Sequence, residues 1–307
     1  MCQVANYLKL WGVRGSYPAP HATHMRVGGN TACVELCVDG HRLIFDAGSG
    51  IIPLGNHLIT QFPDSHQTLN ILISHYHWDH ISGLPFFAPA FMPNWTINLY
   101  APGDSDSEVE KYIAGQMQSP YFPVEVEVWQ AQINYRHTQR KIQHGAFSIE
   151  TFYLHHPGIT LGYMIKFHGK TIVYMSDNEL AFIDHSIKAR ESEFDPHEFE
   201  LILAMAHEER HNALAQIKGA DILLHDAQYT PEDYAKKRGW GHSCYVDTIQ
   251  FALDAKVKSL YLFHLDPSYD DDFIDELHQN ALRHSQNGNH TLECHIAREG
   301  LIIPLIK

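Results

Sequence analysis

The chain has 307 residues, of which 44% are hydrophobic and 19% are charged, as is typical of a globular protein with a sizeable core. Its formal charge of −14 argues against a nucleic-acid-binding surface, which needs cations to displace counterions. No apolar run is long enough to span a bilayer and no basic-then-apolar leader opens the chain, so we expect a cytoplasmic protein with no membrane partner. Five cysteines without a Cys-x-x-Cys pair do not indicate a disulfide framework.

Three strands are predicted before residue 50, at 7–13, 32–38 and 42–45. Glycine-rich loops lie at 27–31 and 46–50, where backbone amides could approach a ligand closely. Ordinary turn chemistry explains these glycines equally well.

Residues 74–80, Ser-His-Tyr-His-Trp-Asp-His, follow an apolar run at 69–73 that predicts a buried strand. The segment holds four potential metal ligands within six residues: His75, His77, Asp79 and His80. Buried imidazoles and a carboxylate carry a large desolvation penalty, which a bound metal removes. His75 and His77 point the same way on an extended segment, whereas the other two lie beyond it in a turn, so one segment can face two metal positions. A histidine-rich surface loop is the alternative in a chain with 24 histidines.

The middle of the chain predicts a helix at 105–118 and strands at 124–129 and 147–154. His155 and His156 precede Pro-Gly at the end of the last strand, and the residues alone leave open which of them faces a site.

A hairpin is predicted from strands at 161–167 and 171–174, and Asp177 follows it. A carboxylate at the end of an apolar strand indicates either a metal ligand or a helix cap.

Residues 180–218 are less regular, and we predict no function for them. His207-Glu-Glu-Arg-His211 fits the His-Glu-x-x-His pattern of zinc proteases, but no further histidine-containing extension follows it. We therefore interpret the His207/His211 pair as a chance match.

The C-terminal part predicts strands at 220–226 and 259–263, which end at Asp226 and just before His264. Gly241-His242-Ser243 is predicted to open a helix that runs to about residue 255 and is followed by another at 271–286. A helix N-terminus would favour a neutral His242 or a bound anion. Asp226 could offset this by accepting a hydrogen bond from the imidazole and holding it as a proton donor. A simple neighbour of a helix cap is the alternative for His242.

Several of these motifs together resemble the metallo-β-lactamase superfamily, in the phosphodiesterase-like branch that includes ribonuclease Z. The matching segments are Gly-Gly-Asn-Thr, Phe-Asp-Ala-Gly-Ser-Gly, the histidine motif, His-Pro-Gly, His-Asp-Ala and Gly-His-Ser, at 28–31, 45–50, 75–80, 156–158, 225–227 and 241–243. Asp226 stands where ribonuclease Z has a glutamate. The resemblance implies a single domain over 1–307 with an α/β fold, a four-layer αβ/βα sandwich.

The resemblance also implies a site with two divalent metal ions. Zn²⁺ is the expected metal, and Mn²⁺ or iron are the alternatives. His75, His77 and His156 are expected to hold one ion. The second ion is expected on Asp79, His80 and His264, with Asp177 as the bridge. The expected catalytic residues are Asp79, His242 and Asp226.

The function implied is metal-dependent hydrolysis of a small phosphodiester, such as a cyclic nucleotide. A ribonuclease Z-like RNA endonuclease would need a basic arm that is not found in the sequence, so a polynucleotide partner is not expected. A thioester or lactone hydrolase would not explain Gly-His-Ser, and a non-catalytic sensor or scaffold would be expected to lack some ligands. A homodimer is left open.

Overall fold

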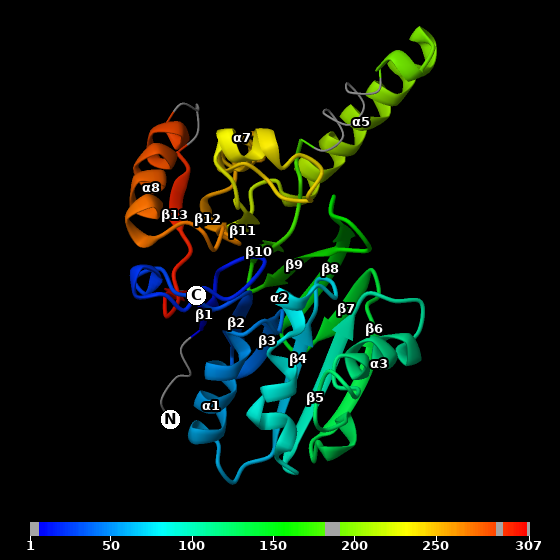
Figure 1. The fold of residues 1–307 in the computed structure, drawn as a ribbon, viewed down its shortest axis with the longest axis vertical. Coiled ribbons are helices and arrows are strands. Elements are labelled where there is room, and N and C mark those ends of the chain that lie inside the picture. Colours follow the sequence, from blue (N-terminus) through cyan, green and yellow to red (C-terminus); the bar gives the residue numbers. More distant parts are fainter. Residues whose placement is uncertain (1–5, 182–190, 287–290, 306–307) are drawn as a thin grey trace. The chain divides into compact units, whose positions relative to one another are not determined.

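The computed structural model describes residues 6–181, 191–286 and 291–305; within these ranges the side chains at 192, 206, 207 and 209 are not described. The chain divides into two compact units (Figure 1). Unit 1 comprises residues 1–152, 266–271 and 297–307, and unit 2 comprises residues 153–265 and 272–296. The expectation of one domain over 1–307 stays a prediction.

Unit 1 contains a mixed sheet with the strand order β14-β1-β2-β3-β4-β5-β6. Its strands are β1 (Tyr7–Gly12), β2 (Cys33–Val38), β3 (His41–Phe45), β4 (Gln67–Leu72), β5 (Trp95–Ala101), β6 (Gln132–His137) and β14 (Ile302–Pro304). β2 and β3 form a hairpin through Asp39 and Gly40, whose φ angles of 52° and 83° suit the two central positions of a tight turn. β3 to β6 run parallel to one another, so the ends of β3 and β4 lie at the same edge of the sheet.

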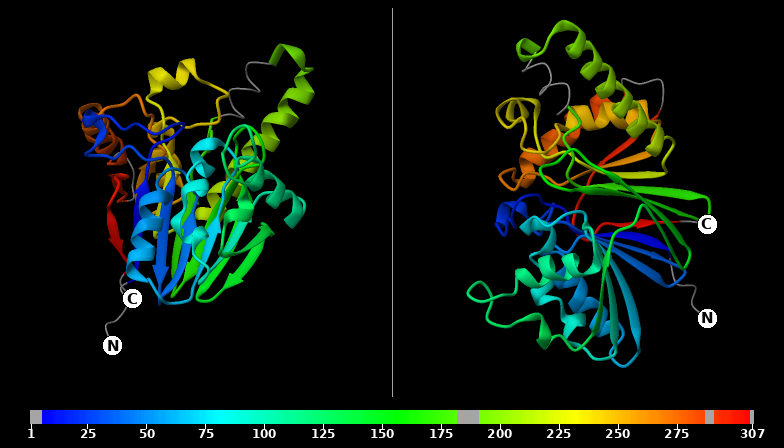
Figure 2. Two further views of the ribbon diagram at one scale, coloured as in Figure 1. Left: turned by 60° about the horizontal axis from the view of Figure 1, so that its bottom comes forward. Right: turned by 90° about the vertical axis from the view of Figure 1, so that its right-hand side faces the viewer.

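The core of unit 1 lies between this sheet and its helices, α1 (Ile51–Gln61) and α3 (Asp106–Gly115). Both helices place apolar side chains in one buried cluster with Ile44, Ile71 and Ile97 of the sheet. Figure 2 shows these helices along one face of the sheet. This packing fixes the strand ends from which the site residues project.

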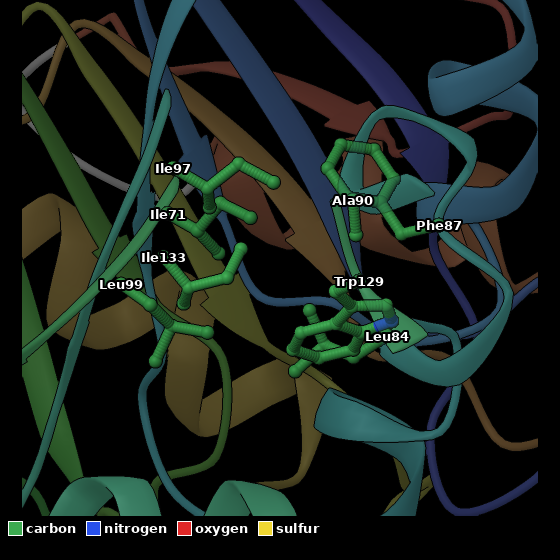
Figure 3. A pocket seen from close by; sticks show the side chains of 8 residues that line it. All are labelled: Ile71, Leu84, Phe87, Ala90, Ile97, Leu99, Trp129 and Ile133. Atoms are coloured by element: carbon green, nitrogen blue, oxygen red, sulfur yellow. The ribbon is translucent and has the colours of Figure 1, made fainter. Parts of the chain in front are cut away.

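A small apolar cavity lies within this core, between Trp129 and strands β4, β5 and β6 (Figure 3). Its volume is about 10 Å³, which is room for about one water molecule, and its lining is entirely apolar. The cavity is therefore a packing gap and not a substrate site.

Unit 2 contains the strand order β13-β12-β11-β10-β9. Its strands are β9 (Leu161–Phe167), β10 (Lys170–Met175), β11 (Ile222–Asp226), β12 (Ser259–Phe263) and β13 (Glu293–Ile296). β9 and β10 form the predicted antiparallel hairpin, and β10 to β13 are parallel. Parallel strands end at the same edge, so the residues that follow β10, β11 and β12 are brought together.

The helices of the second half of the chain are α5 (Pro196–Ile217), α6 (Pro231–Lys236), α7 (Tyr245–Asp254) and α8 (Asp271–Ser285). α7 packs against β11 and β12. The predicted α/β class is confirmed, and most of the predicted strands are found within one or two residues of their expected bounds. A further hairpin, β7 (Lys141–His144) with β8 (Phe147–Tyr153), contains the predicted strand at 147–154.

The predicted strand at 124–129 is wrong. Residues Val126–Val128 form a short 3₁₀ helix, and the neighbouring strand is β6, further along the chain. The alternation of valine and glutamate does not mark a buried face here, because Val124 and Val128 are 40% and 41% exposed. Without burial on one side, alternation alone does not hold a strand in a sheet.

The irregular structure expected at 180–218 is also only partly correct. Residues 182–190 lie outside the described residues, but α5 is a helix of 22 residues. Asp195 and Glu198 form a capping box at its start, and Pro196 occupies the first helical position. No helix of the described residues is long and apolar enough to cross a membrane. The cytoplasmic location and the homodimer stay predictions.

Candidate functional site

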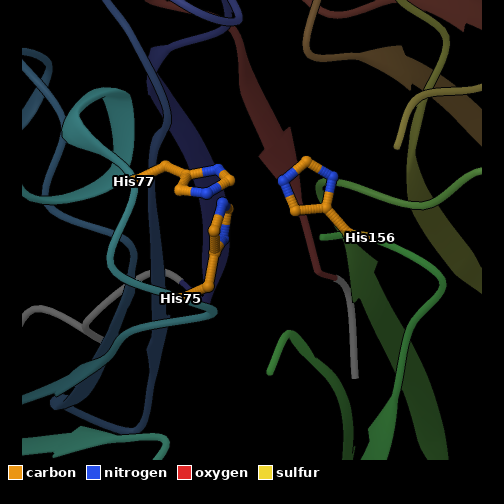
Figure 4. Close-up of side chains that lie close together, drawn as sticks. All are labelled: His75, His77 and His156. Carbon is orange, nitrogen blue, oxygen red and sulfur yellow. The ribbon is translucent and has the colours of Figure 1, made fainter. Parts of the chain in front are cut away.

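The donor segment of unit 1 lies between β4 and α2 (Trp78–Ile81). The ring centroids of His75 and His77 are 4.4 Å apart, and those of His75 and His80 are 4.3 Å apart. Figure 4 shows the imidazoles of His75 and His77 side by side on this segment, and that of His156 on the segment that follows β8. The predicted grouping of His75, His77 and His80 within one segment is thus observed.

Asp46, at the end of β3, fixes the segment. Its carboxylate accepts hydrogen bonds from the backbone NH of Ser74 at 2.7 Å and from the Ser74 hydroxyl at 2.9 Å. It also accepts from Nδ1 of His80 at 2.8 Å. The backbone at Asp46 is left-handed, with φ of 57°, which turns the chain sharply after the strand. Asp46 is therefore a positioning residue, a role that the sequence motifs did not indicate.

Asp79 is oriented by a second loop. Its Oδ2 accepts a hydrogen bond of 2.7 Å from the backbone NH of Ser16 and lies 3.3 Å from Nε2 of His80. Ser16 has a φ of 62°, so its amide is presented by a strained turn. Nothing in the sequence pattern around residue 16 indicated this contact.

The donor set of unit 2 centres on Asp177, two residues beyond β10. Its Oδ1 lies 3.3 Å from Nε2 of His264, and its Oδ2 lies 3.7 Å from Nε2 of His156. Nδ1 of His242 is 3.9 Å from the same Oδ2. The ring of His242 stacks on that of His264 at 5.0 Å. The structure thus gathers three predicted imidazoles of unit 2 around the buried carboxylate of Asp177.

The hydrogen bonds of these imidazoles show which nitrogen faces the carboxylate. His156 donates from Nδ1 to the carbonyl oxygen of Gly241 at 2.9 Å, and His264 donates from Nδ1 to Oε1 of Gln228 at 2.9 Å. A neutral imidazole that donates from Nδ1 carries a lone pair on Nε2. His80 in unit 1 has the same arrangement, with its Nδ1 on Asp46 and its Nε2 near Asp79.

These donor sets fit divalent metal ions. A lone pair on Nε2 and a carboxylate oxygen about 3–4 Å apart repel each other unless a cation lies near both. Metal-bound histidines commonly donate their other NH to a carboxylate or a carbonyl, as they do here. Imidazole nitrogen and carboxylate oxygen suit zinc, manganese and iron alike. The cluster of histidine and aspartate therefore fits a metal site.

His242 forms a hydrogen bond of 2.7 Å from Nδ1 to Oδ2 of Asp226. The same carboxylate accepts from the backbone NH groups of Gln228 at 2.9 Å and of Asn178 and Ser243 at 3.3 Å each. Asp226 is fully buried at the end of β11. This network fixes the ring of His242 and agrees with the predicted pairing.

The structure corrects the predicted start of the helix that follows His242. α7 begins at Tyr245, so His242 lies in the loop three residues before the helix. Residues 241–244 belong to the loop, because the regular hydrogen-bonded turns of the helix start only at Tyr245. The contact with Asp226, and not a helix N-terminus, positions this imidazole.

The structure also distinguishes the other candidate histidines from one another. His156 faces Asp177, as the His-Pro-Gly match implied, whereas the backbone of His155 contacts Asn178 and Glu179. His211 is exposed on α5 and belongs to none of the metal-binding groups found among the described residues. The side chain of His207 is not described, so the interpretation of this pair as a chance match stays a prediction.

Comparison with known proteins agrees with this architecture. The family model of the beta-lactamase superfamily domain matches residues 41–200, just over half of the chain. Ribonuclease Z from Oceanobacillus iheyensis is 25% identical over 230 residues, which is 69% of this chain and 75% of that protein.

Two solved structures show the same fold. The metallo-beta-lactamase fold protein YhfI from Bacillus subtilis superposes with a TM-score of 0.63 at 18% identity, over 97% of this chain and 99% of that one. A diphosphatase of the PhnP family gives a TM-score of 0.60 at 17% identity, over 98% of both chains. The predicted α/β sandwich fold is therefore confirmed. The chain belongs to the metallo-β-lactamase superfamily and is a metal-dependent hydrolase.

Proposed function

We propose that this hydrolase cleaves a small phosphodiester, such as a cyclic nucleotide, with two divalent metal ions. The observation that carries the proposal is the pair formed by His242 and Asp226 next to the Asp177 cluster. A metal site alone suits many hydrolases. A buried carboxylate that holds an imidazole beside that site adds a proton donor, which an alkoxide leaving group requires.

The proposed ligands are the seven residues that the sequence motifs selected. His75, His77 and His156 would hold one ion, Asp79, His80 and His264 would hold the other, and Asp177 would be shared by both. Two bound ions would neutralise the phosphodiester and lower the pKa of the attacking water. Zinc is our first candidate, with manganese or iron as alternatives.

The protein side chains supply orientation and proton transfer. Because Asp226 holds Nδ1 of His242, the Nε2–H of the protonated ring is the group that delivers a proton to the leaving oxygen. The buried carboxylate stabilises the positive charge of that ring. Asp79, which accepts a hydrogen bond from the backbone NH of Ser16, is assigned as the base that accepts a proton from the attacking water.

A ribonuclease Z-like endonuclease is the second candidate. Ribonuclease Z from Oceanobacillus iheyensis matches 69% of the chain, which does not support our expectation of no polynucleotide partner. The charge of −14 still disfavours long nucleic acids, because their binding depends strongly on cationic contacts.

The substrate class is tested with protein purified without chelator and supplied with zinc, manganese or iron. We expect close to two metal equivalents per chain and turnover of bis-para-nitrophenyl phosphate and of a cyclic nucleotide. His75→Ala should reduce the metal content. Much faster cleavage of a lactone or thioester would reject the phosphodiesterase assignment. A metal content that stays at one equivalent per chain would reject the two-ion site. Faster cleavage of a structured RNA would favour the second candidate, and no turnover would favour a sensor.

The acid role is tested by His242→Ala. We expect kcat to fall by roughly 10²–10⁴-fold on an alkoxide leaving group and much less on nitrophenolate, which needs no proton. Metal content should not change. His284→Ala, an exposed imidazole on α8, is the control. An equal loss on both leaving groups would remove His242 from the acid role.

A further inference from the structure

The loop between α6 and α7 is held by one buried carboxylate. Glu179 is 1% exposed, and its Oε1 accepts from the Tyr234 hydroxyl and from the backbone NH of Gly239, both at 2.8 Å. Its Oε2 accepts from the backbone NH of Gly241 at 2.9 Å. Hydrogen bonds to a charged acceptor are strong, so the backbone is fixed on both sides of Trp240.

Both glycines of this loop are required by its geometry. Gly239 and Gly241 have φ angles of +81° and +89°. A Cβ on Gly241 would lie 2.2 Å from Nδ1 of His156, and the carbonyl of Gly241 accepts the hydrogen bond from that nitrogen. The loop therefore contacts a predicted metal ligand, and its next residue is His242.

Trp240 is 63% exposed although the backbone around it is fixed. An exposed aromatic residue by itself is common and needs no explanation. Here the indole is displayed by an ordered loop, two residues from the proposed proton donor. An indole face in such a position can stack on a flat ring of the substrate.

Cationic side chains precede the indole directly. Lys236, Lys237 and Arg238 are consecutive in a chain whose formal charge is −14. Lys236 and Arg238 are exposed, and Nζ of Lys237 lies 4.5 Å from the centre of the Tyr229 ring. A short cationic run beside an exposed aromatic ring is the combination that binds a phosphate together with a base.

We propose that residues 236–240 form a subsite for the leaving nucleoside, in which Trp240 stacks on the base and Lys236 and Arg238 attract the phosphate of the diester. This inference rests on the proposed phosphodiesterase function and narrows its substrate to diesters with a nucleoside on the leaving oxygen. In the reaction, water attacks phosphorus, the P–O5′ bond breaks, and His242 gives its proton to O5′. Trp240 is a specificity-determining residue in this scheme.

Binding without turnover tests the subsite first. The metal-loaded protein should bind AMP roughly 5- to 100-fold more tightly than ribose 5-phosphate, the range for one base stacked on an aromatic side chain. Calorimetry of Trp240→Ala should give a ratio near one, whereas Trp240→Phe should retain part of the preference. Tyr121→Ala, which removes an exposed aromatic ring of unit 1, is the control and should keep the wild-type ratio.

The role of the cationic residues of the subsite is tested by combining Lys236→Gln with Arg238→Gln. This variant should bind AMP and ribose 5-phosphate more weakly by a similar factor, with a reduced dependence on salt concentration. The ratio of the two affinities should stay that of the wild type. Lys218→Gln, an exposed lysine just after α5, is the matched control. A variant that binds both ligands as the wild type does would overturn the role of these cations.

Kinetics then separate the two proposals. The methyl ester of AMP should release adenosine, and Trp240→Ala should lower kcat/KM for this ester by roughly 5- to 100-fold, but not for methyl para-nitrophenyl phosphate. If no phosphodiester is cleaved but AMP binding still depends on Trp240, the phosphodiesterase function fails and the subsite survives. A wild-type affinity ratio near one, an equal kinetic loss on both esters, or release of methanol in place of adenosine would overturn the subsite.

Discussion

The donor sets of the two units differ in how the chain supplies them. Unit 1 provides its four predicted ligands from six consecutive residues after β4. Unit 2 collects its residues from separate segments that follow β8, β10 and β12 and precede α7. The first set depends on local sequence, whereas the second exists only once the parallel strands of unit 2 have paired. Removal of supporting residues should therefore affect the two sets in different ways.

The supporting contacts also differ. In unit 1, one carboxylate, Asp46, holds Ser74 and His80. In unit 2, the support is divided among Asp226, Gln228 and Gly241, which contact His242, His264 and His156 in turn. A distributed set has more positions at which a single change should matter.

The largest effect is expected for Asp226→Ala. It removes a buried carboxylate that accepts from His242 and from three backbone NH groups, so the free energy of unfolding should fall by about 3–5 kcal/mol. Urea unfolding of metal-free protein measures it. Asp46→Ala should also lower it, because Ser74 and His80 lose their acceptor. Glu232→Ala, an exposed control on α6, should stay within about 0.5 kcal/mol of the wild type. A loss for Asp226→Ala no larger than this control would mean that the network does not stabilise unit 2.

The second prediction compares two glycines of one loop. Gly241→Ala should lower the free energy of unfolding by about 2–3 kcal/mol, because a positive φ and contact with His156 act together. Gly239→Ala has a positive φ but open space around its Cβ, so about 1 kcal/mol is expected. Urea midpoints give both values, and equal losses would show that contact with His156 does not restrict the loop.

The third prediction concerns metal affinity. Asp46→Asn and Gln228→Ala each remove the acceptor for the Nδ1 hydrogen of one histidine, His80 or His264. Each should weaken metal binding by roughly 10- to 100-fold, as measured by competition with a chromophoric chelator. Asn134→Ala, which breaks a 2.9 Å contact with Asn98 on the sheet, should leave the affinity unchanged. If only one of the two variants loses affinity, the units do not both supply ligands.

The smallest effect is expected from the titration of one buried imidazole in each unit. Burial lowers the pKa of His144 in unit 1 and of His225 in unit 2 below the ordinary value of about 6.5. Below pH 6.5 the unfolded chain therefore takes up a proton that the folded chain resists, and stability falls as the pH falls.

This pH effect is measured as the change in urea midpoint between pH 7.5 and 5.5 for metal-free protein. Replacement of either histidine by glutamine should reduce the change, and more so for His225, which is fully buried. A larger change in either variant than in the wild type would contradict the sign of these shifts.

The sequence predicted much of the site because its residues lie at the ends of short apolar strands. His264 directly follows β12, and Asp177 lies two residues beyond β10. Parallel strands that end together bring such residues to one edge, so the motif and the strand pattern sufficed to select them. Strands were less certain where burial was partial, as the exposed valines at 124 and 128 show. The start of α7 was predicted too early, because residues 241–244 form a loop that no local sequence pattern indicates.

By itself, the sequence determined the family and the α/β class and predicted which residues serve as donors, because donor chemistry and apolar strand runs are local properties. The tertiary structure decided which atom of each donor is presented. Asp46, Gln228 and the carbonyl of Gly241 select the Nδ1–H form of their histidines from positions up to 85 residues away in the chain. Such hydrogen bonds form only after distant strands and loops have packed, so no spacing in the sequence records them.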